Sequence, residues 1–455
     1  MKKRILSVLL VVALILSMAA CGKASTPEGG TSGDTSGTKA DTQANGVTDA
    51  KTDTETKSDP GASDKKVTIR FEDFNASGDN ESVLRAQIDA FNEVYPNIKI
   101  DLQTVAYDGY TSQLMAKISA GEAPDVFELS FDDLVSFAAK DVLTPLDDII
   151  ASQNIDTSIY NKLVLESFKY DGKLYGIPSN FSNVVMFYNK DLFDRAGVSY
   201  PTNEWTWADA EDAAKKIRAL DENTYGYYRP ITYNEFYKVI AQNGGSIMNA
   251  DSTAFTVNTP EAVEAAEYMV SLVNDSNVQP SEEQMAGMGG WDLFKSGRLG
   301  MIMTGIWAIP TFVTDCEFNW DIEVEPGQKQ HASHFFTNAF VVNKNSEVAE
   351  EAALFINFIA SNPAATTLAV DANWVLPAVD DQELIDRYSA ITPPDNKKSV
   401  FESVDYLVMA PVIEQSSEAA DIVNNYLGQI ASQKMTAQEA LDACQKELDE
   451  KIKLN

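Results

Sequence analysis

The alternation of strand-like and helix-like segments between residues 67 and 129 constrains the fold more than any other feature of this chain. Residues 66–71 alternate polar and apolar side chains, as a half-buried strand does. An amphipathic helix is predicted over residues 84–95, because its apolar side chains recur with helical spacing, and Pro96 ends it. Residues 98–102 alternate again and predict a second strand.

A second helix and a third strand complete this pattern. Leu114 and Ile118 share one helical face, and Gly121 stands where a helix commonly ends in left-handed backbone. Val126 to Leu129 is a short apolar run, typical of a buried strand. The strand–helix–strand–helix–strand order predicts an α/β fold with a mostly parallel, doubly wound sheet.

The stretch from Trp291 to Pro310 predicts a binding-site aromatic residue. Trp291 and Phe294 share a face of a short helix, and a buried strand follows over residues 299–303. Trp307 then lies beyond the carboxyl end of that strand, which is where open α/β sheets bind ligands. The alternative is that both tryptophans are core packing.

Three stretches of the chain carry the same resemblance. The first is the helix, strand and Gly-x-Trp turn that contains Phe294, Gly297, Met301, Gly305 and Trp307. The second is residues 115–126, where a helix runs into Ala-Gly-Glu-Ala-Pro-Asp-Val, and the third reads YGIP and then YNKDLF between residues 175 and 193. Together they resemble the extracellular solute-binding proteins of carbohydrate ABC importers, the maltose-binding-protein group, over residues 67–455.

This resemblance implies a periplasmic-binding-protein-like type II fold, with two lobes, a ligand cleft between them and hinge crossings. The N-terminal lobe is expected to comprise residues 67–177 and 338–373, and the C-terminal lobe residues 178–327 and 378–455. The resemblance further implies a binding protein rather than an enzyme, without a cofactor. Such a protein captures a sugar or oligosaccharide and delivers it, as a monomer, to the permease subunits of an ABC importer.

The resemblance also places candidate ligand-binding residues. In the maltose-binding group an aspartate at the position of Asp132 hydrogen-bonds sugar hydroxyls, whereas the tryptophan found three residues earlier is replaced here by Leu129. Residues 180–183 are expected at the lobe junction, and the tyrosines of residues 225–237 form either a sugar-facing wall or a lobe core. The candidate ligand-binding residues are Asp73, Asn75, Asp132, Asn183, Tyr233, Trp291, Trp307 and Trp374.

The N-terminal residues predict export. A basic start and a short apolar run, Ile5–Leu16, indicate a secretory signal peptide over residues 1–20, too short to span a bilayer. Cys21 follows Ala-Ala and resembles a bacterial lipobox, which implies a lipid-modified cysteine (palmitate). An ordinary secretion signal with an incidental cysteine is the alternative. Residues 21–66 are polar and predict a disordered tether of about 35–40 Å, which suits a protein anchored on the extracellular face of a Gram-positive-like cell membrane.

The charge excludes some classes of partner. The 35 basic and 68 acidic residues give a net charge of −33. Repulsion from phosphate therefore argues against nucleic acid and against anionic membrane surfaces as partners. The same balance disfavours an anionic ligand less strongly, because a local basic pocket can override the global field.

No motif in the sequence predicts catalysis or a metal site. There is no Gly-x-Ser-x-Gly motif and no phosphate loop, and His331 and His334 would face opposite ways on a strand. Cys444 shares a helical face with apolar residues and predicts a buried thiol, although a disulfide with Cys316 stays open. The alternative functions are a receptor for a non-sugar solute (polyol phosphate, polyamine or peptide) or a secreted glycosidase.

Overall fold

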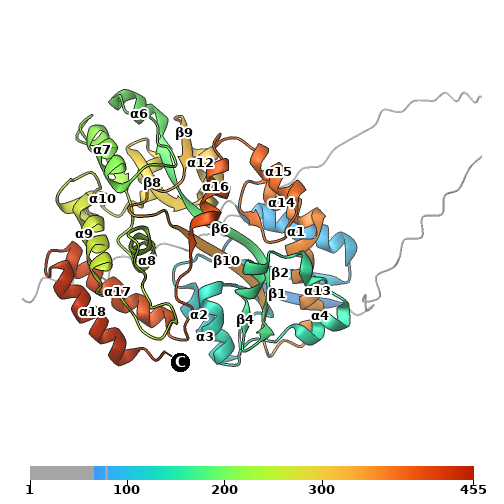
Figure 1. The fold of residues 1–455 in the computed structure, drawn as a ribbon. Coiled ribbons are helices and arrows are strands. Elements are labelled where there is room, and N and C mark those ends of the chain that lie inside the picture. The colour runs from blue at the N-terminus through green and yellow to red at the C-terminus, as the bar shows by residue number, and fades with distance from the viewer. Residues whose placement is uncertain (1–65, 77–79, 455) are drawn as a thin grey trace, which may run out of the picture. The chain divides into compact units, whose positions relative to one another are not determined.

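The computed structural model describes residues 66–76 and 80–454 (Figure 1). The predicted signal peptide, the lipid-modified Cys21 and the tether lie outside the described residues.

The described chain alternates helices and strands. Its first part comprises β1 (Val67–Asp73), α1 (Glu81–Val94), β2 (Ile98–Thr104), α2 (Tyr110–Ala120), β3 (Val126–Ser130), α3 (Phe131–Ala139), α4 (Asp147–Gln153), η2 (Thr157–Ile159), α5 (Lys162–Glu166), β4 (Lys169–Tyr170) and β5 (Lys173–Leu174). The middle part comprises β6 (Gly176–Asn189), α6 (Lys190–Ala196), α7 (Trp207–Arg218), β7 (Tyr225–Tyr228), α8 (Tyr233–Gln242), α9 (Pro260–Asn274), α10 (Glu282–Met285), α11 (Gly290–Lys295), β8 (Leu299–Gly305), η3 (Ile306–Ala308), α12 (Ile309–Asp315) and β9 (Trp320–Glu323). The last part comprises β10 (Ser333–Val342), α13 (Ala349–Ser361), α14 (Pro363–Asp371), β11 (Leu376–Pro377), α15 (Gln382–Ala390), α16 (Lys398–Glu402), η4 (Ser403–Tyr406), β12 (Leu407–Val408), α17 (Ser416–Ala431) and α18 (Ala437–Lys451).

Local sequence signals set several helix ends, among them the end predicted at Gly121. The Thr206 side chain caps α7, and Thr436 caps α18 in a reciprocal box with Glu439. Gly121 closes α2 with a φ of +73°, a backbone conformation that costs glycine little.

Strand β6 is shared by two sets of strands, and the sheet is organised around it (Figure 1). The first strand set has the order β2-β1-β3-β10-β6, and its partner on β6 is the segment Gly176–Asn183. The second strand set consists of β8, β7 and β9 around the segment Val184–Asn189 of β6. A single strand therefore passes from one set to the other.

The prediction of a mostly parallel sheet is correct only in part. Strands β1, β2 and β3 are parallel to one another, whereas β10 is antiparallel to both β3 and β6. In the second set β6 is antiparallel to β8 and β9. The sheet is mixed because the chain leaves the first set along β6 and returns to it along β10.

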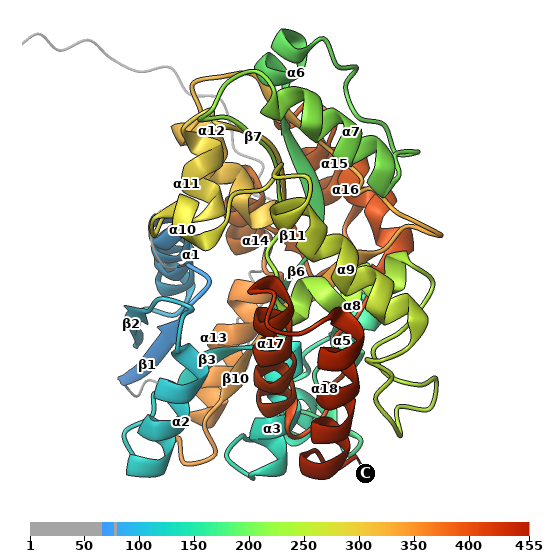
Figure 2. The same cartoon turned by 90° about the vertical axis from the view of Figure 1, so that its left-hand side faces the viewer.

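The helices divide between the two strand sets (Figures 1 and 2). Helices α1, α13 and α14 pack together beside the first set, and α15 packs on α14. Helices α17 and α18 lie side by side and both contact α9, and α17 also contacts α8 and α3 (Figure 2). The lobe boundaries predicted from the sequence stay a prediction.

One hydrophobic core runs through both strand sets. Within the first strand set, Phe71 makes edge-to-face contacts with Phe340 and Phe355, each at a centroid distance of 5.3 Å. A smaller cluster lies around Met186 and Tyr227 under α6 and α7. Cys444 is buried as predicted, and both it and Cys316 are free thiols.

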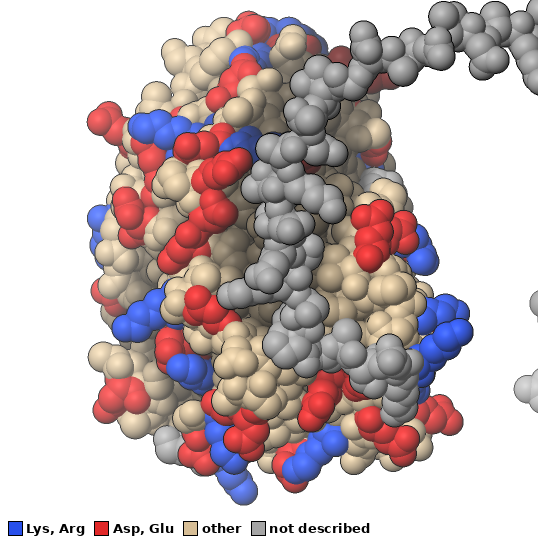
Figure 3. Space-filling model, turned by 90° about the vertical axis from the view of Figure 1, so that its right-hand side faces the viewer, with Lys and Arg blue, Asp and Glu red and all other residues tan. Residues whose placement is uncertain are grey.

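No single helix among the described residues is long and apolar enough to span a membrane. Helices α13 and α14, which meet at a 49° bend, have the required length and composition only when they are taken together. On the face drawn in Figure 3, acidic and basic side chains are interspersed over the surface. Exposed pairs of this kind contribute little stability individually.

Candidate functional site

The carboxyl ends of β1 and β3 bring two buried carboxyl groups together. Asp73 and Glu128 are each 1% exposed, and their side chains are hydrogen-bonded to each other. The Asp73 carboxylate accepts the backbone N–H of Ala76 at 2.6 Å. Glu128 accepts the backbone N–H of Asn75 at 3.3 Å and the hydroxyl of Ser179 at 3.1 Å. Neighbouring parallel strands end at the same sheet edge, so this pair lies where ligands of α/β sheets bind.

Burial gives this pair an unusual protonation. It raises the pKa of Asp73 to about 6 and the pKa of Glu128 well above its ordinary value. The negative charge of Asp73 adds to the rise at Glu128. A hydrogen bond between two carboxyl groups requires a proton on one of them, and the raised pKa values of both groups favour such a shared proton.

We expect the free energy of unfolding to depend on pH through Asp73. Between about pH 4 and 6 the folded state binds more protons than the unfolded chain, because the pKa of Asp73 is raised from 3.8 to about 6 on folding. Stability therefore falls as pH rises through this window, by on the order of 3 kcal/mol for this group. Urea denaturation of Asp73→Asn should show a correspondingly smaller fall than the wild type, while the exposed control Asp101→Asn keeps the wild-type slope. An unchanged slope in Asp73→Asn would contradict the shared-proton pair.

Two further carboxylates begin α3, directly after β3. Asp133 accepts the hydroxyl of Thr111 at 2.9 Å and that of Ser130 at 3.1 Å. Burial and the neighbouring charge of Asp132 raise the pKa of Asp133 to about 6, and burial raises the pKa of Asp132. Asp132 is only partly exposed, and it stands at the end of the strand as the sequence predicted.

Five aromatic rings form a continuous row, which we call the aromatic row. It runs from Trp307 to Phe336 (centroid distance 5.6 Å), His334 (5.0 Å), Tyr237 (5.1 Å) and Tyr233 (5.6 Å). The row joins the end of β8 to the start of α8 across β10. Phe336 and Trp307 are half-buried, so this end of the row keeps an accessible surface.

Asp132 acts on the tyrosine end of the aromatic row. Burial is the larger cause of the raised pKa values of Tyr233 and Tyr237, and the negative charge of Asp132 adds to it. The same charge contributes to the raised pKa of Tyr107. Asp132 and Tyr233, two of the predicted residues, are thus close enough for the charge of one to affect the other, and Trp307 lies at the far end of the same row.

Tyr237 is a candidate that the sequence did not single out. Its side chain is 3% exposed, and its hydroxyl is buried with no hydrogen-bond partner among the described residues. Buried hydroxyls without a partner are rare in folded proteins, and one beside a carboxylate is suited to a hydroxylated ligand. The only sequence signal was the density of tyrosines around it.

The two tryptophans of the 291–310 stretch differ in their surroundings. A side-chain Cβ at Gly305 would lie 2.0 Å from the Trp307 ring, so the glycine allows the indole to fold back over the strand end. Trp291 instead packs edge-on against Phe312, and its Nε1 donates to the hydroxyl of Thr304 at 3.0 Å. The structure therefore gives Trp291 packing and hydrogen-bond partners away from the aromatic row.

Trp374 faces a small cavity at the carboxyl ends of β1 and β3. The cavity measures about 30 Å³, and its walls include Asp73, Asn75, Glu128, Asn180 and Trp374. Trp374 is 5% exposed, and its Nε1 has no hydrogen-bond partner among the described residues. A donor of this kind, set among carboxyl and amide oxygens, fits a water molecule or a ligand hydroxyl.

Asn183 lies where β6 changes from one strand set to the other. It is 0% exposed, and its Nδ2 donates to the backbone carbonyl of Val400 at 2.6 Å. In this structure the side chain joins β6 to α16.

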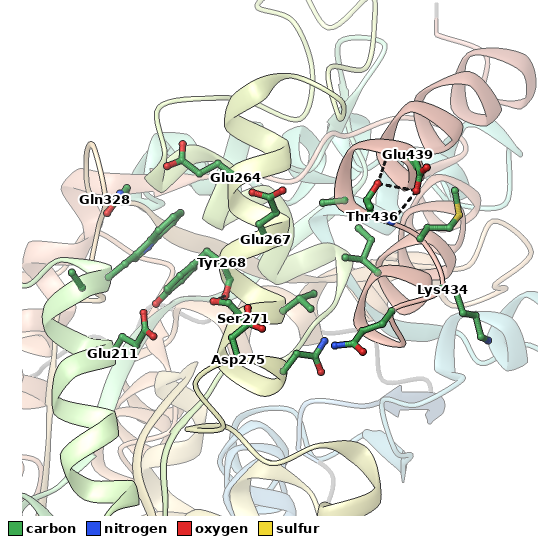
Figure 4. A pocket seen from close by; sticks show the side chains of 18 residues that line it. Glu211, Glu264, Glu267, Tyr268, Ser271, Asp275, Gln328, Lys434, Thr436 and Glu439 are labelled. Atoms are coloured by element: carbon green, nitrogen blue, oxygen red, sulfur yellow. Dashed lines mark hydrogen bonds between the residues drawn. The ribbon is translucent and has the colours of Figure 1, made fainter.

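A groove of about 870 Å³ lies elsewhere, between α7, α9 and the start of α18 (Figure 4). Acidic side chains rim it, among them Glu211, Glu264, Glu267, Asp275 and Glu439. The rings of Trp207 and Tyr268 are stacked within it at a centroid distance of 4.1 Å. Glu211 and Glu439 are already engaged, by Lys215 and by the Thr436 cap.

A metal site is not indicated in the part of the chain that the structure describes: no three His, Cys, Asp or Glu side chains gather there to hold an ion. The strand shared between two strand sets, with helices packed around both, is the arrangement of the periplasmic-binding-protein-like type II fold.

The chain belongs to the bacterial extracellular solute-binding protein family, whose model matches residues 75–366. The resemblance predicted from the sequence is therefore confirmed, and so is the interpretation as a binding protein rather than an enzyme. An ABC substrate-binding protein of Listeria monocytogenes, solved in complex with cycloalternan, is 41% identical, with a TM-score of 0.82 over 85% of this chain and 99% of that chain. The arabinooligosaccharide-binding protein of Bacillus subtilis is 24% identical over 85% of this chain and 93% of its own length. The acarbose-binding GacH receptor of Streptomyces glaucescens is 21% identical, with a TM-score of 0.75 over 85% of this chain and 98% of that chain, and shows the same fold.

Proposed function

We propose that this protein is the carbohydrate-binding component of an ABC importer and that its ligand is an oligosaccharide of the cycloalternan type. The observation that carries the proposal is the aromatic row, whose last ring, Tyr233, feels the negative charge of Asp132. Sugars offer apolar ring faces that stack on aromatic side chains and hydroxyls that need paired donors and acceptors. The similarity to the Listeria protein supports the choice of cycloalternan as the first ligand.

In this proposal the ligand sits in a cleft between two lobes that correspond to the two strand sets. Trp307 stacks on a sugar ring, and Asp132, Tyr233 and Tyr237 bind hydroxyls. The small cavity beside Trp374 takes a further hydroxyl or a water. The crossing of β6 near Asn183 then serves as part of a hinge, and closure around the sugar is the signal that the permease subunits read.

A ligand panel tests the proposal. Isothermal titration and thermal shift should detect cycloalternan, with linear oligosaccharides such as maltose and acarbose as comparison. Sn-glycerol 3-phosphate and spermidine represent the non-sugar alternatives, a polyol phosphate and a polyamine. Binding of either non-sugar solute, with no response to any saccharide, would overturn the carbohydrate assignment.

We further propose that Cys21 carries a lipid anchor that holds the protein on the extracellular face of the membrane. One relative, from Streptomyces antibioticus, is named a lipoprotein and is 24% identical over 70% of this chain. Changing Cys21→Ala should release the protein from the membrane fraction or leave it unprocessed, whereas Cys316→Ala should change neither property. Membrane association and mature mass that are unchanged in Cys21→Ala would refute the anchor.

A further inference from the structure

Lys397 is a buried lysine that forms no ion pair with any described residue. It is 2% exposed, whereas the next residue, Lys398, is exposed and pairs with Glu402. The Lys397 ammonium donates to the backbone carbonyl of Tyr388 at 2.8 Å and to the side-chain carbonyl of Asn373. It also lies 3.9 Å from the centre of the Tyr388 ring. Such a group is costly to bury, and its cost is offset by these neutral contacts.

The acceptor of this lysine is the residue directly before Trp374. Asn373 is 5% exposed and has a φ of +59°, a left-handed conformation that asparagine tolerates better than most residues. Its Nδ2 donates to the carbonyl of Pro393 at 3.4 Å. Two side-chain bonds therefore fix the turn from which Trp374 enters the small cavity.

Adjacent residues of the same segment hold other parts of the junction. The backbone N–H of Asn396 donates to Asp321 at 2.9 Å, and its side chain donates to Glu323 at 3.0 Å, so it binds β9 of the second strand set. The carbonyl of Val400 accepts from Asn183 at 2.6 Å, in the middle of β6. Residues 396–400 thus contact β9, the centre of β6 and the turn before Trp374.

The charged groups on the surrounding helices and strand are engaged elsewhere. Arg387 of α15 pairs with Asp371 of α14, while Asp321 and Glu323 of β9 accept from Asn396. Burial then lowers the pKa of Lys397 to about 7. A neutral amine still has two N–H donors, so both of its hydrogen bonds persist in either protonation state.

We propose that Lys397 is a positioning residue for sugar binding: through Asn373 it holds Trp374 in the wall of the small cavity and ties that wall to β9 and β6. This inference rests on the proposed function, because it takes Trp374 as part of the binding site. Lys397 itself touches no ligand in this arrangement and acts only through Asn373.

The variants that test it are Lys397→Met, Asn373→Gly and the control Lys398→Met. Methionine keeps the length and apolar stem of lysine, and glycine keeps the left-handed backbone while it removes the acceptor. Six tryptophans give six indole N–H resonances in ¹H–¹⁵N spectra of the ligand-free protein, and Trp374→Phe assigns the one that matters. Both test variants should move the Trp374 resonance and leave the other five in place, and Lys398→Met should move none.

Binding provides the second measurement. Lys397→Met and Asn373→Gly should each weaken cycloalternan binding by about two- to thirtyfold, and the double variant should be no weaker than the worse single one. An unmoved Trp374 resonance in either folded variant, or additive losses in the double variant, would overturn the positioning role. If cycloalternan does not bind even the wild type, the proposed ligand fails, whereas the indole spectra still decide the role of Lys397.

Discussion

Trp307→Ala should weaken oligosaccharide binding by about 2–4 kcal/mol, or roughly 30- to 1000-fold, with a smaller effect on folding. The indole is half-buried, and its contact with Phe336 places it at one end of the aromatic row. A sugar ring stacked on the indole would bury its apolar C–H face against the indole ring, and alanine offers no such surface. Calorimetric titration and a thermal melt on the same variant separate binding from stability.

Asp132→Ala tests the other end of the row. A carboxylate that accepts two sugar hydroxyls makes charge-assisted hydrogen bonds, so its loss should cost at least about tenfold in affinity. Trp291→Phe is the matched control, because Trp291 bonds Thr304 and packs on Phe312 away from the row. A Trp307→Ala protein that melts at a lower temperature and still binds sugar at full affinity would show that Trp307 is core packing.

Local signals in the sequence predicted the elements well. Capping residues such as Thr206 and Thr436 act within one turn of their own helix, so their effect does not depend on the rest of the fold. The return of the chain to the first strand set along β10 was expected only through the family resemblance, which assigned residues 338–373 to the N-terminal lobe. The antiparallel direction of β10 was missed, because local apolar periodicity carries no information about strand direction.

The details of the site depend on contacts between distant segments. Glu128 pairs with Asp73 across 55 residues of sequence, and nothing in either local pattern predicts it. Tyr237 and His334 meet in the aromatic row only because α8 and β10 pack together. Trp291 is among the candidate ligand-binding residues, and its hydrogen bond to Thr304, 13 residues further along the chain, could not be predicted from the local pattern.

Behind the aromatic row, four charged side chains are buried together. Lys238 donates to Glu235 at 2.9 Å and to Glu325 at 2.7 Å, and Arg229 lies 3.4 Å from Glu325. The side chains of both cations are 0% exposed, and those of the carboxylates are 7% and 1% exposed. His334, whose pKa burial lowers to about 3, stays neutral beside them, and its Nε2–H donates to the backbone carbonyl of Asn234 at 2.7 Å. The two positive and two negative charges balance, so none is left uncompensated.

Glu325→Gln should therefore lower the free energy of unfolding by about 3–5 kcal/mol at neutral pH, because it leaves one buried positive charge without its partner. Urea denaturation measures this loss, and Glu166→Gln, which breaks the exposed pair with Lys169, should cost less than about 1 kcal/mol. Adding Lys238→Met to Glu325→Gln removes the excess charge, so the double variant should be more stable than the sum of the single losses predicts.

A small loss of stability in Glu325→Gln would mean that Glu325 is protonated in the folded protein. Burial raises the pKa of Glu325, while Lys238 and Arg229 act against that rise. If Glu325 were protonated in the folded protein, glutamine would replace it nearly without cost, since the two side chains have similar shape and hydrogen-bonding groups. A loss below about 1 kcal/mol in Glu325→Gln would thus show a buried cluster with an excess positive charge directly behind Tyr237 and His334. That excess positive charge would attract an electron-rich sugar oxygen to the tyrosine end of the aromatic row more strongly than a balanced cluster would.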